Sequence, residues 1–582
     1  MLLAIVPFLL TTLPAILALP PPQPCKPPYY PPPHVRVANG TLQGVRLPSL
    51  NQDLFLGVPF AQPPIHDLRL RRPVSLNETW TGVKKVVERS VSCPGYGGFS
   101  EGLRMGEDCL TLDIVRPSGV REGDKLPVFV WIYGGGFTAG GSADGRYNTS
   151  YLVATSTYVG KAIIAVSLNY RVAGWGFLAS REVVEAGETN IGLFDQRLAL
   201  RWVQENIAAF GGDPEKVTIA GESAGAYSVG YHMVGFGGDH GGLFRGAVMQ
   251  SGGALGPVLE DTTTLETSYQ PMYDNITATV ACDKAPDTLS CLRHVPYSTL
   301  SAAFSPFVMT PILDGDFLRQ LPSTSFAQGN VANVALLAGS NTDEGTATFF
   351  GPRGTLFTDA DVHSFLSDPP GRKHLDNETV SRLMDLYPDD PVQGCPFNTG
   401  AQRFAEDGNG AQYKRGAAIV GDLAIHAGRR ATTEYFASLP ERRRKPVYSY
   451  RFDQGPWNGV LELIATTAPV YATHYAEVAF VFDIDPAVSV NATNWIGPDP
   501  RYHALARAMA RAWVAFVHNL DPNVDFASGY DGLGKLQLPH WPDYASGGEN
   551  MVFRVDGSYI ETDTWREEQL AYWTGLWGPL KT

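Results

Sequence analysis

The amino-acid sequence predicts an α/β fold built around one large, mostly parallel sheet. Residues 125–133 and 161–170 are continuous apolar runs with β-branched side chains, which is typical of strands covered on both faces. Such runs alternate with helix-type segments, for example at residues 193–210. This alternation favours a parallel sheet wrapped by helices. No long linker, charge run or internal repeat interrupts residues 34–582, so we expect one domain there.

Local patterns predict the individual elements. The strand-type runs, in chain order, occupy residues 35–47, 53–61, 125–133, 161–170, 216–220, 244–252 and 331–340. The first two indicate an opening hairpin or meander. Within residues 193–210 the apolar side chains recur at helical spacing, and Gly211-Gly212 ends the helix. These side chains are Leu198, Trp202, Val203, Ile207 and Phe210.

The N-terminal residues indicate export. Residues 1–18 are apolar, short and interrupted by proline, which is typical of a signal peptide, although a basic first region is missing and a buried N-terminal strand or helix is the alternative. Residues 19–33 form a proline-rich arm, interpreted as a spacer. Six N-x-S/T sequons predict glycosylation of a secreted protein, at Asn39, Asn77, Asn148, Asn275, Asn377 and Asn491.

The net charge and the apolar segments of the chain indicate which classes of partner are disfavoured. The formal net charge of -14 disfavours nucleic acids and anionic membrane surfaces, because both would repel the chain. No segment after residue 18 is apolar and long enough to predict stable membrane insertion. The sequence does not indicate an oligomeric state.

Six cysteines in an exported chain predict disulfides, since no CxxC motif or Cys/His cluster predicts a metal site. Proximity in sequence favours Cys93–Cys109 and Cys282–Cys291. Elimination then leaves Cys25 with Cys395, a weak assignment because Cys25 lies in the proline-rich arm.

Ser223 is the predicted nucleophile. It is the centre of Gly-Glu-Ser-Ala-Gly at residues 221–225, which follows a strand-type run and precedes a helix-type run. This strand–turn–helix setting is that of a nucleophile elbow. Glycines on both sides allow a sharp turn that holds the serine at a helix N-terminus, where developing negative charge is favoured. A structural glycine-rich turn is the alternative.

Three consecutive glycines follow the strand-type run 125–133 and predict an oxyanion hole. Gly134, Gly135 and Gly136 can turn backbone N–H groups toward the serine without side chains intervening. We expect the donors to be the N–H groups of Gly135, Gly136 and Ala224.

With these motifs the sequence resembles the type-B carboxylesterase/lipase family, which includes cholinesterases and fungal lipases. The matching segments are FLGVPFAQPP, EDCLTLDIVRP, WIYGGGFTAG, VSLNYRVAGWGFLA, NIGLFDQRLALRWVQENIAAFGGDPEKVTIAGESAG and SNTDEGT, in the family's order. The resemblance extends from about Val35 to Trp577. It implies the α/β-hydrolase fold, with helical insertions over the active site.

The resemblance also implies the rest of a catalytic triad. The acid matches Glu344, with Asp343 as the alternative that we expect to face solvent or cap the turn, and the base matches His474. His426 and His540 have structural interpretations. Glu222 resembles the family's buried glutamate, which stabilises the protonated imidazole or only packs.

The predicted function is hydrolysis of small carboxylic esters through an acyl-enzyme, without metal or cofactor. The loop between Cys93 and Cys109 is short and glycine-rich, which favours an esterase over a lipase with a broad lid. That loop contains Tyr96 and Phe99 but lacks the tryptophan with which cholinesterases stack choline, so choline esters are disfavoured. A long-chain lipase, an esterase of a specialised-metabolite pathway and a non-catalytic adhesion or binding module are the alternatives.

Overall fold

The computed structural model describes residues 30–256, 259–261, 265–347, 354–367, 375–405, 408–457, 471–484, 496–523 and 538–580. The predicted signal peptide, most of the proline-rich arm and the sequon at Asn491 lie outside these residues.

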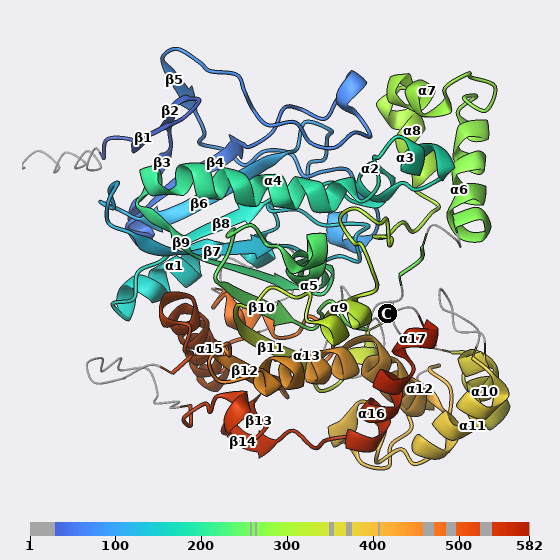
Figure 1. The fold of residues 1–582 in the computed structure, drawn as a ribbon. Helices are drawn as coiled ribbons and strands as arrows, with labels where there is room; N and C mark the ends of the chain where they lie inside the picture. Colours follow the sequence, from blue (N-terminus) through green and yellow to red (C-terminus); the bar gives the residue numbers. More distant parts are fainter. Residues whose placement is uncertain are drawn as a thin grey trace, which may run out of the picture.

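The described residues contain one sheet of eleven strands, in the order β14-β13-β12-β11-β10-β9-β7-β8-β6-β4-β3 (Figure 1). Every neighbouring pair from β8 to β13 is parallel, and the pairs at both edges are antiparallel. The strands are β3 (Val45–Leu47), β4 (Gln52–Pro59), β6 (Thr111–Pro117), β7 (Leu126–Ile132), β8 (Ile164–Leu168), β9 (Gly212–Glu222), β10 (Gly246–Gln250), β11 (Ala335–Asn341), β12 (Val447–Phe452), β13 (Glu549–Phe553) and β14 (Tyr559–Thr562).

A smaller sheet contains β1 (His34–Val37), β2 (Gly40–Gln43) and β5 (Val83–Lys85). β1 and β2 form the antiparallel hairpin predicted from residues 35–47.

Helices flank the large sheet. They are α1 (Thr149–Tyr158), α2 (Ala173–Phe177), α3 (Arg181–Glu185), α4 (Ile191–Asn206), α5 (Ala224–Gly238), α6 (Leu265–Thr279), α7 (Thr288–His294), α8 (Tyr297–Phe304), α9 (Pro322–Gln328), α10 (Asp359–Ser367), α11 (Asn377–Leu386), α12 (Tyr413–Gly421), α13 (Ala427–Ser438), α14 (Val478–Val481), α15 (Pro500–Asn519), α16 (Glu567–Gly575) and α17 (Trp577–Leu580). α4 and α5 contact β9, α13 contacts β11 and β12, and α15 contacts β7 and β9. Two helical insertions follow β10 and β11: α6–α8 gather at one corner of the molecule and α10–α12 at another (Figure 1).

The predicted strands and helix have clear physical causes. Every residue of β8 is buried, and so is every residue of β7 except Leu126, as expected of β-branched runs covered on both faces. The predicted helix over residues 193–210 is divided into α4 and a 3₁₀ turn at Ile207–Phe210. Gly211, with φ of 88°, ends that turn in the left-handed conformation that glycine adopts at little cost.

Among the described residues, no helix combines the length and the apolar character needed to cross a bilayer.

Candidate active site

Ser223 lies between β9 and α5 with φ of 54°, the strained conformation expected of a nucleophile elbow. The turn leaves no room for side chains on either side of it. A Cβ on Gly225 would lie 2.0 Å from the Ile132 carbonyl oxygen, and one on Gly221 would lie 2.4 Å from the Gly225 carbonyl carbon. Both glycines of the motif are therefore required sterically.

The glycine run passes directly beside this serine. A Cβ on Gly134 would lie 3.2 Å from the Ser223 Cβ and 2.7 Å from the Glu222 carbonyl oxygen. Gly135 and Gly136 follow with φ of 104° and 63°, so both use backbone conformations that other residues adopt at a cost. Ala224, the third predicted donor, is the first residue of α5 and is buried. Gly134 of the glycine run and Ala224 of α5 thus both border the serine.

Glu344 and His474 are in direct contact. Glu344 Oε2 lies 2.6 Å from His474 Nδ1, and both side chains are buried. The other carboxylate oxygen, Oε1, accepts a 2.7 Å hydrogen bond from the Asn341 N–H at the end of β11. Both carboxylate oxygens therefore have partners, which fixes the orientation of the carboxylate toward the imidazole.

Glu222 approaches the other nitrogen of the same ring. Its Oε1 lies 3.2 Å from His474 Nε2, and its side chain is fully buried. Burial raises the pKa of Glu222 well above its ordinary value, and the negative charges of Glu477 and Glu344 raise it further. The buried surroundings therefore disfavour the charged form of this carboxyl group.

A third buried carboxylate, Glu477, was not anticipated from the sequence. It accepts hydrogen bonds from Asn341 Nδ2 at 2.6 Å and from Gln250 Nε2 at 3.2 Å. Its pKa is raised, chiefly by burial and then by the charge of Glu344. The sequence signal is a single carboxylate three residues after His474, in a run that otherwise is apolar.

Comparisons with known proteins identify the family. Residues 31–573 match the model of the carboxylesterase family. The chain belongs to the carboxylesterase family.

Known relatives of this carboxylesterase include secreted fungal enzymes. It is 35% identical to Secreted lipase 1 of Botryotinia fuckeliana over 89% of each chain, and 34% identical to Lipase 4 of Diutina rugosa over 92% of this chain and 94% of that one. The crystal structure of EstA from Aspergillus niger covers 95% of this chain and 99% of its own, with a TM-score of 0.78 and 26% identity. The protein is a carboxylic ester hydrolase of the α/β-hydrolase fold.

Two disulfides of the carboxylesterase join the predicted pairs, Cys93–Cys109 and Cys282–Cys291. The third assignment was wrong, because Cys395 is a free, buried thiol, and Cys25 lies outside the described residues. The Cys395 Sγ instead contacts Arg566 Nη2 at 3.4 Å and the Thr342 carbonyl oxygen at 3.7 Å. Burial raises the pKa of this thiol to about 12, so the thiol stays protonated at neutral pH.

Asp343 differs from expectation, since it neither faces solvent nor caps a turn with its side chain. It is fully buried, and its carboxylate accepts hydrogen bonds from the Phe397 N–H at 2.8 Å and the Ala472 N–H at 3.2 Å. Burial raises its pKa to about 7. Asp343 therefore joins the end of β11 to the segment that leads into His474.

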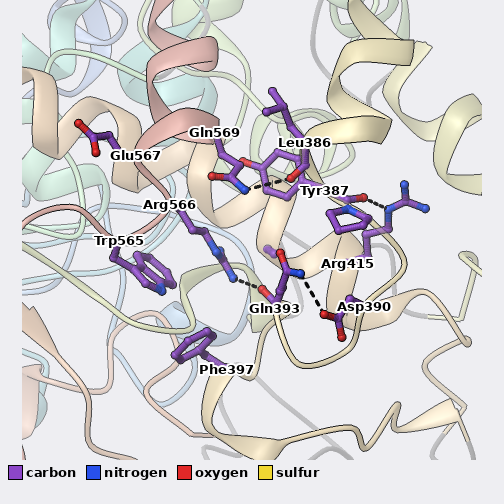
Figure 2. A pocket seen from close by; sticks show the side chains of 13 residues that line it. Leu386, Tyr387, Asp390, Gln393, Phe397, Arg415, Trp565, Arg566, Glu567 and Gln569 are labelled. Carbon is purple, nitrogen blue, oxygen red and sulfur yellow. Dashed lines mark hydrogen bonds between the residues drawn. The ribbon is translucent and has the colours of Figure 1, made fainter.

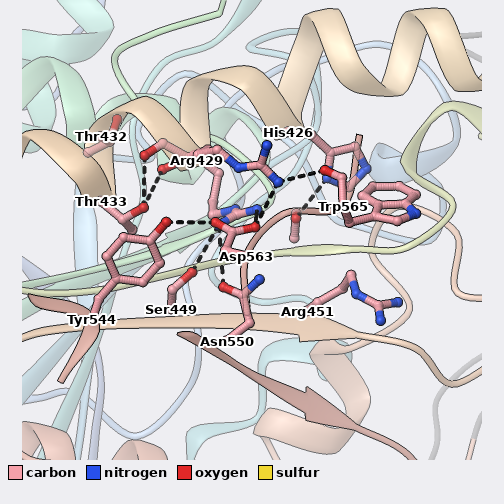
Figure 3. A network of polar contacts seen from close by, with 12 residues as sticks. His426, Arg429, Thr432, Thr433, Ser449, Arg451, Tyr544, Asn550, Asp563 and Trp565 are labelled. Carbon is pink, nitrogen blue, oxygen red and sulfur yellow. Dashed lines mark hydrogen bonds and ion pairs between the residues drawn. The ribbon is translucent and has the colours of Figure 1, made fainter. Parts of the chain in front are cut away.

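His426 has a structural environment, as its helical position suggested. It ends a π-helical turn, Asp422–His426, and its Nδ1 lies 3.0 Å from Ser340 Oγ. Figure 3 places it beside Trp565 and near the buried network of Arg429 and Asp563. His540, the other competitor, is exposed.

The buried His426 of the carboxylesterase predicts loss of stability in acid. Burial lowers its pKa well below the ordinary value, and the charges of four arginines lower it further: Arg566, Arg429, Arg430 and Arg451. Below about pH 6.5 the unfolded chain binds a proton at this residue that the folded chain does not bind. We therefore expect the melting temperature to fall more steeply between about pH 6.5 and 5 in the wild type than in His426→Gln. Parallel melting curves for the two proteins would contradict this assignment.

A cavity of about 300 Å³ lies apart from the serine (Figure 2). Aromatic rings and arginines of separate segments line it, including Tyr387, Phe397, Arg415, Trp565 and Arg566. None of the predicted catalytic residues contributes to its wall. Arg566 is engaged there by Asp422 and by the Gln393 carbonyl oxygen, so we assign this cavity no part in ester hydrolysis.

Proposed function

We propose that the protein is a secreted serine esterase that cleaves small, soluble carboxylic esters through Ser223, His474 and Glu344. The observation that supports the proposal most directly is the 2.6 Å contact between Glu344 Oε2 and His474 Nδ1. The same imidazole lies 3.2 Å from Glu222, the residue that precedes Ser223. Ser223 itself follows β9 with positive φ. Nucleophilic catalysis by a triad needs a serine exposed on such a turn and an imidazole that a carboxylate orients, and both features support the proposal.

The residues then divide the reaction among them. His474 takes the proton of Ser223 while the serine oxygen attacks the ester carbonyl, and Glu344 holds the imidazole in the required tautomer. The N–H groups of Gly135, Gly136 and Ala224 stabilise the oxyanion. His474 then gives the proton to the leaving alcohol, and water hydrolyses the acyl-enzyme. Glu222 Oε1 lies 3.2 Å from Nε2 and helps to hold the ring in position.

The disulfide loop between Cys93 and Cys109 favours an esterase. Tyr96 attaches it to the rest of the site, because its N–H donates to the Thr138 carbonyl oxygen at 2.8 Å and its hydroxyl donates to the Ser301 carbonyl oxygen at 2.9 Å. Near the other end of the loop, Glu107 forms a 2.6 Å ion pair with the buried Arg69. Moving this loop would separate the ion pair and break both hydrogen bonds of Tyr96. Opening this loop as a lid at a lipid surface is therefore costly.

Similarity to Secreted lipase 1 and Lipase 4 favours long-chain lipase activity as the second candidate. We expect the purified protein to hydrolyse p-nitrophenyl butyrate below its solubility limit, with no increase in rate when an oil–water interface forms. Long-chain p-nitrophenyl palmitate should be a poorer substrate with and without the interface. A sharp rise in rate at the solubility limit would instead support the lipase.

Export is supported by the apolar residues 1–18 and by the similarity to a secreted fungal lipase. Of the predicted glycosylation sites, Asn77, Asn275 and Asn377 are exposed, and Asn148 is half-buried. Asn39 differs, since its Nδ2 donates to the carbonyl oxygens of Leu76 and Glu78. Because glycosylation uses that nitrogen, the exposed asparagines are the better acceptors.

A further inference from the structure

Tyr475, the residue after His474, has an unusual conformation. Its φ is 77°, a region that bulky side chains rarely adopt, and its ring is fully buried. Strain of this kind persists only where the surrounding contacts hold it in place. The residues that contact the ring therefore hold the backbone beside His474 in this conformation.

Two of these neighbours, Phe99 and Arg146, come from different segments. Phe99, in the Cys93–Cys109 loop, contacts the Tyr475 ring edge-on at 5.3 Å between centroids. The Arg146 guanidinium lies 4.9 Å from the Phe99 centroid and 5.7 Å from the Tyr475 centroid. A cation within about 6 Å of an aromatic ring is attracted by the negative face of the ring. Arg146 thus makes a cation–π contact with each of the two rings.

Asp144 holds this guanidinium in place. The Arg146 Nε lies 2.9 Å from Asp144 Oδ1 and 2.8 Å from Oδ2, and the Arg146 Nη2 also contacts Oδ2. Asp144 is buried, so the guanidinium is not free to swing away from the rings. About 22% of the Arg146 side chain stays exposed and Phe99 is half-buried, while Tyr475 lies sealed beneath them. The exposed part of the cluster can therefore meet a ligand.

The cluster is close to the reacting groups. Tyr475 is bonded directly to His474, and the charge of Arg146 opposes the rise in the pKa of Glu222. Glu222 in turn lies 3.2 Å from the His474 Nε2. During the reaction this nitrogen gives its proton to the leaving alcohol, so the alcohol part of an ester lies beside the Glu222 carboxyl group on which the charge of Arg146 acts.

We propose that Arg146 determines specificity by occupying, with its own guanidinium, the aromatic faces beside His474, so that the site excludes positively charged ester alcohols and admits neutral ones. This inference rests on the proposed function. A cationic alcohol would have to displace Arg146 from the rings or lie against it. The Arg146–Asp144 pair has no net charge, so short-range occupation of the rings, more than long-range repulsion, causes the exclusion.

The test compares two esters of equal shape. Acetylcholine and 3,3-dimethylbutyl acetate differ only in whether the branched end of the alcohol carries a positive nitrogen or a neutral carbon. For the wild type we expect kcat/KM to be about tenfold or more lower for the cationic ester. For Arg146→Met the ratio of cationic to neutral kcat/KM should rise by about tenfold, within the range of one cation–π contact. The ratio should stay raised in Asp144→Asn/Arg146→Met, which also removes the charge that the single variant leaves on Asp144. A return of the ratio to the wild-type value in the double variant would overturn the inference.

Arg72→Met is the matched control, because the Arg72 guanidinium also lies on a phenyl ring, 4.0 Å from the Phe194 centroid, and forms an ion pair with Asp316. Its ratio should equal that of the wild type. Loss of catalytic efficiency that affects both esters equally in Arg146→Met would overturn the inference, since it would indicate a positioning role. If Arg146→Met does not fold, the wild type is tested alone. A ratio of cationic to neutral kcat/KM near one would contradict this inference. If the wild type hydrolyses neither ester, the proposed function is contradicted instead.

Discussion

Replacing Ser223 with alanine is expected to lower kcat for p-nitrophenyl butyrate by about 10⁵- to 10⁶-fold, the loss seen when a triad nucleophile is removed. Alanine keeps the Cβ and differs only in the hydroxyl, so the tight packing of Gly134, Gly221 and Gly225 around the turn is undisturbed. The melting temperature should therefore stay close to that of the wild type. Stopped assays on the purified variant, at substrate concentrations above KM, measure the loss.

Ser251 provides a matched control for this variant. Like Ser223 it is buried, follows a parallel strand and has positive φ, in its case 52°. A fluorophosphonate probe should label the wild type and Ser251→Ala, but not Ser223→Ala. Labelling that persists in Ser223→Ala would show that another residue reacts with the probe, and would contradict the assignment of Ser223 as nucleophile.

Ser223 and Gly135 could be singled out from the sequence because each follows a strand with a strong local pattern. β7, β9 and β11 are parallel members of one sheet, so their carboxyl ends lie at one edge, and residues that follow them come together. Only the family resemblance indicated Glu344 and His474, and His474 does not follow a strand of the sheet. The short distances among Glu222, Glu344 and His474 are consequences of the topology.

Burial of polar groups could not be predicted in the same way. Asp343 is buried because backbone N–H groups 54 and 129 residues away satisfy its carboxylate, and no local pattern contains those partners. Glu477 and Arg146 likewise depend on distant groups, namely Gln250 and Phe99. Assigning Cys395 a disulfide from the number of cysteines failed for the same reason, since Arg566 and Thr342 enclose its thiol.

The edge strands show a related limit. β13 and β14 lack the continuous apolar pattern of β7 and β8, and β14 is partly exposed along its whole length. Asp563, just after β14, accepts hydrogen bonds from Arg429 and Arg430, both fully or largely buried (Figure 3). This buried ion-pair network arises only when segments more than 100 residues apart have met.

Glu344→Gln is expected to lower kcat by about 10⁴-fold while leaving KM nearly unchanged, because the glutamine fixes the wrong tautomer of His474. The Asn341 N–H donates to Glu344 Oε1, so the glutamine must keep its carbonyl oxygen there and turn its NH₂ group toward His474 Nδ1. An Nδ1 that accepts a hydrogen bond leaves the ring proton on Nε2, which then cannot take the proton of Ser223. Steady-state kinetics and a thermal melt of the same sample separate this effect from unfolding.

Two further variants test whether Glu344 or Asp343 is the acid of the triad. Glu344→Asp keeps the negative charge, so its loss should be far smaller than that of Glu344→Gln. Asp343→Asn removes the neighbouring carboxylate, whose oxygens are both engaged by backbone N–H groups and do not contact the imidazole. If Asp343→Asn lost more turnover than Glu344→Gln at equal thermal stability, the acid of the triad would be Asp343. The 2.6 Å contact of Glu344 with His474 predicts the opposite order.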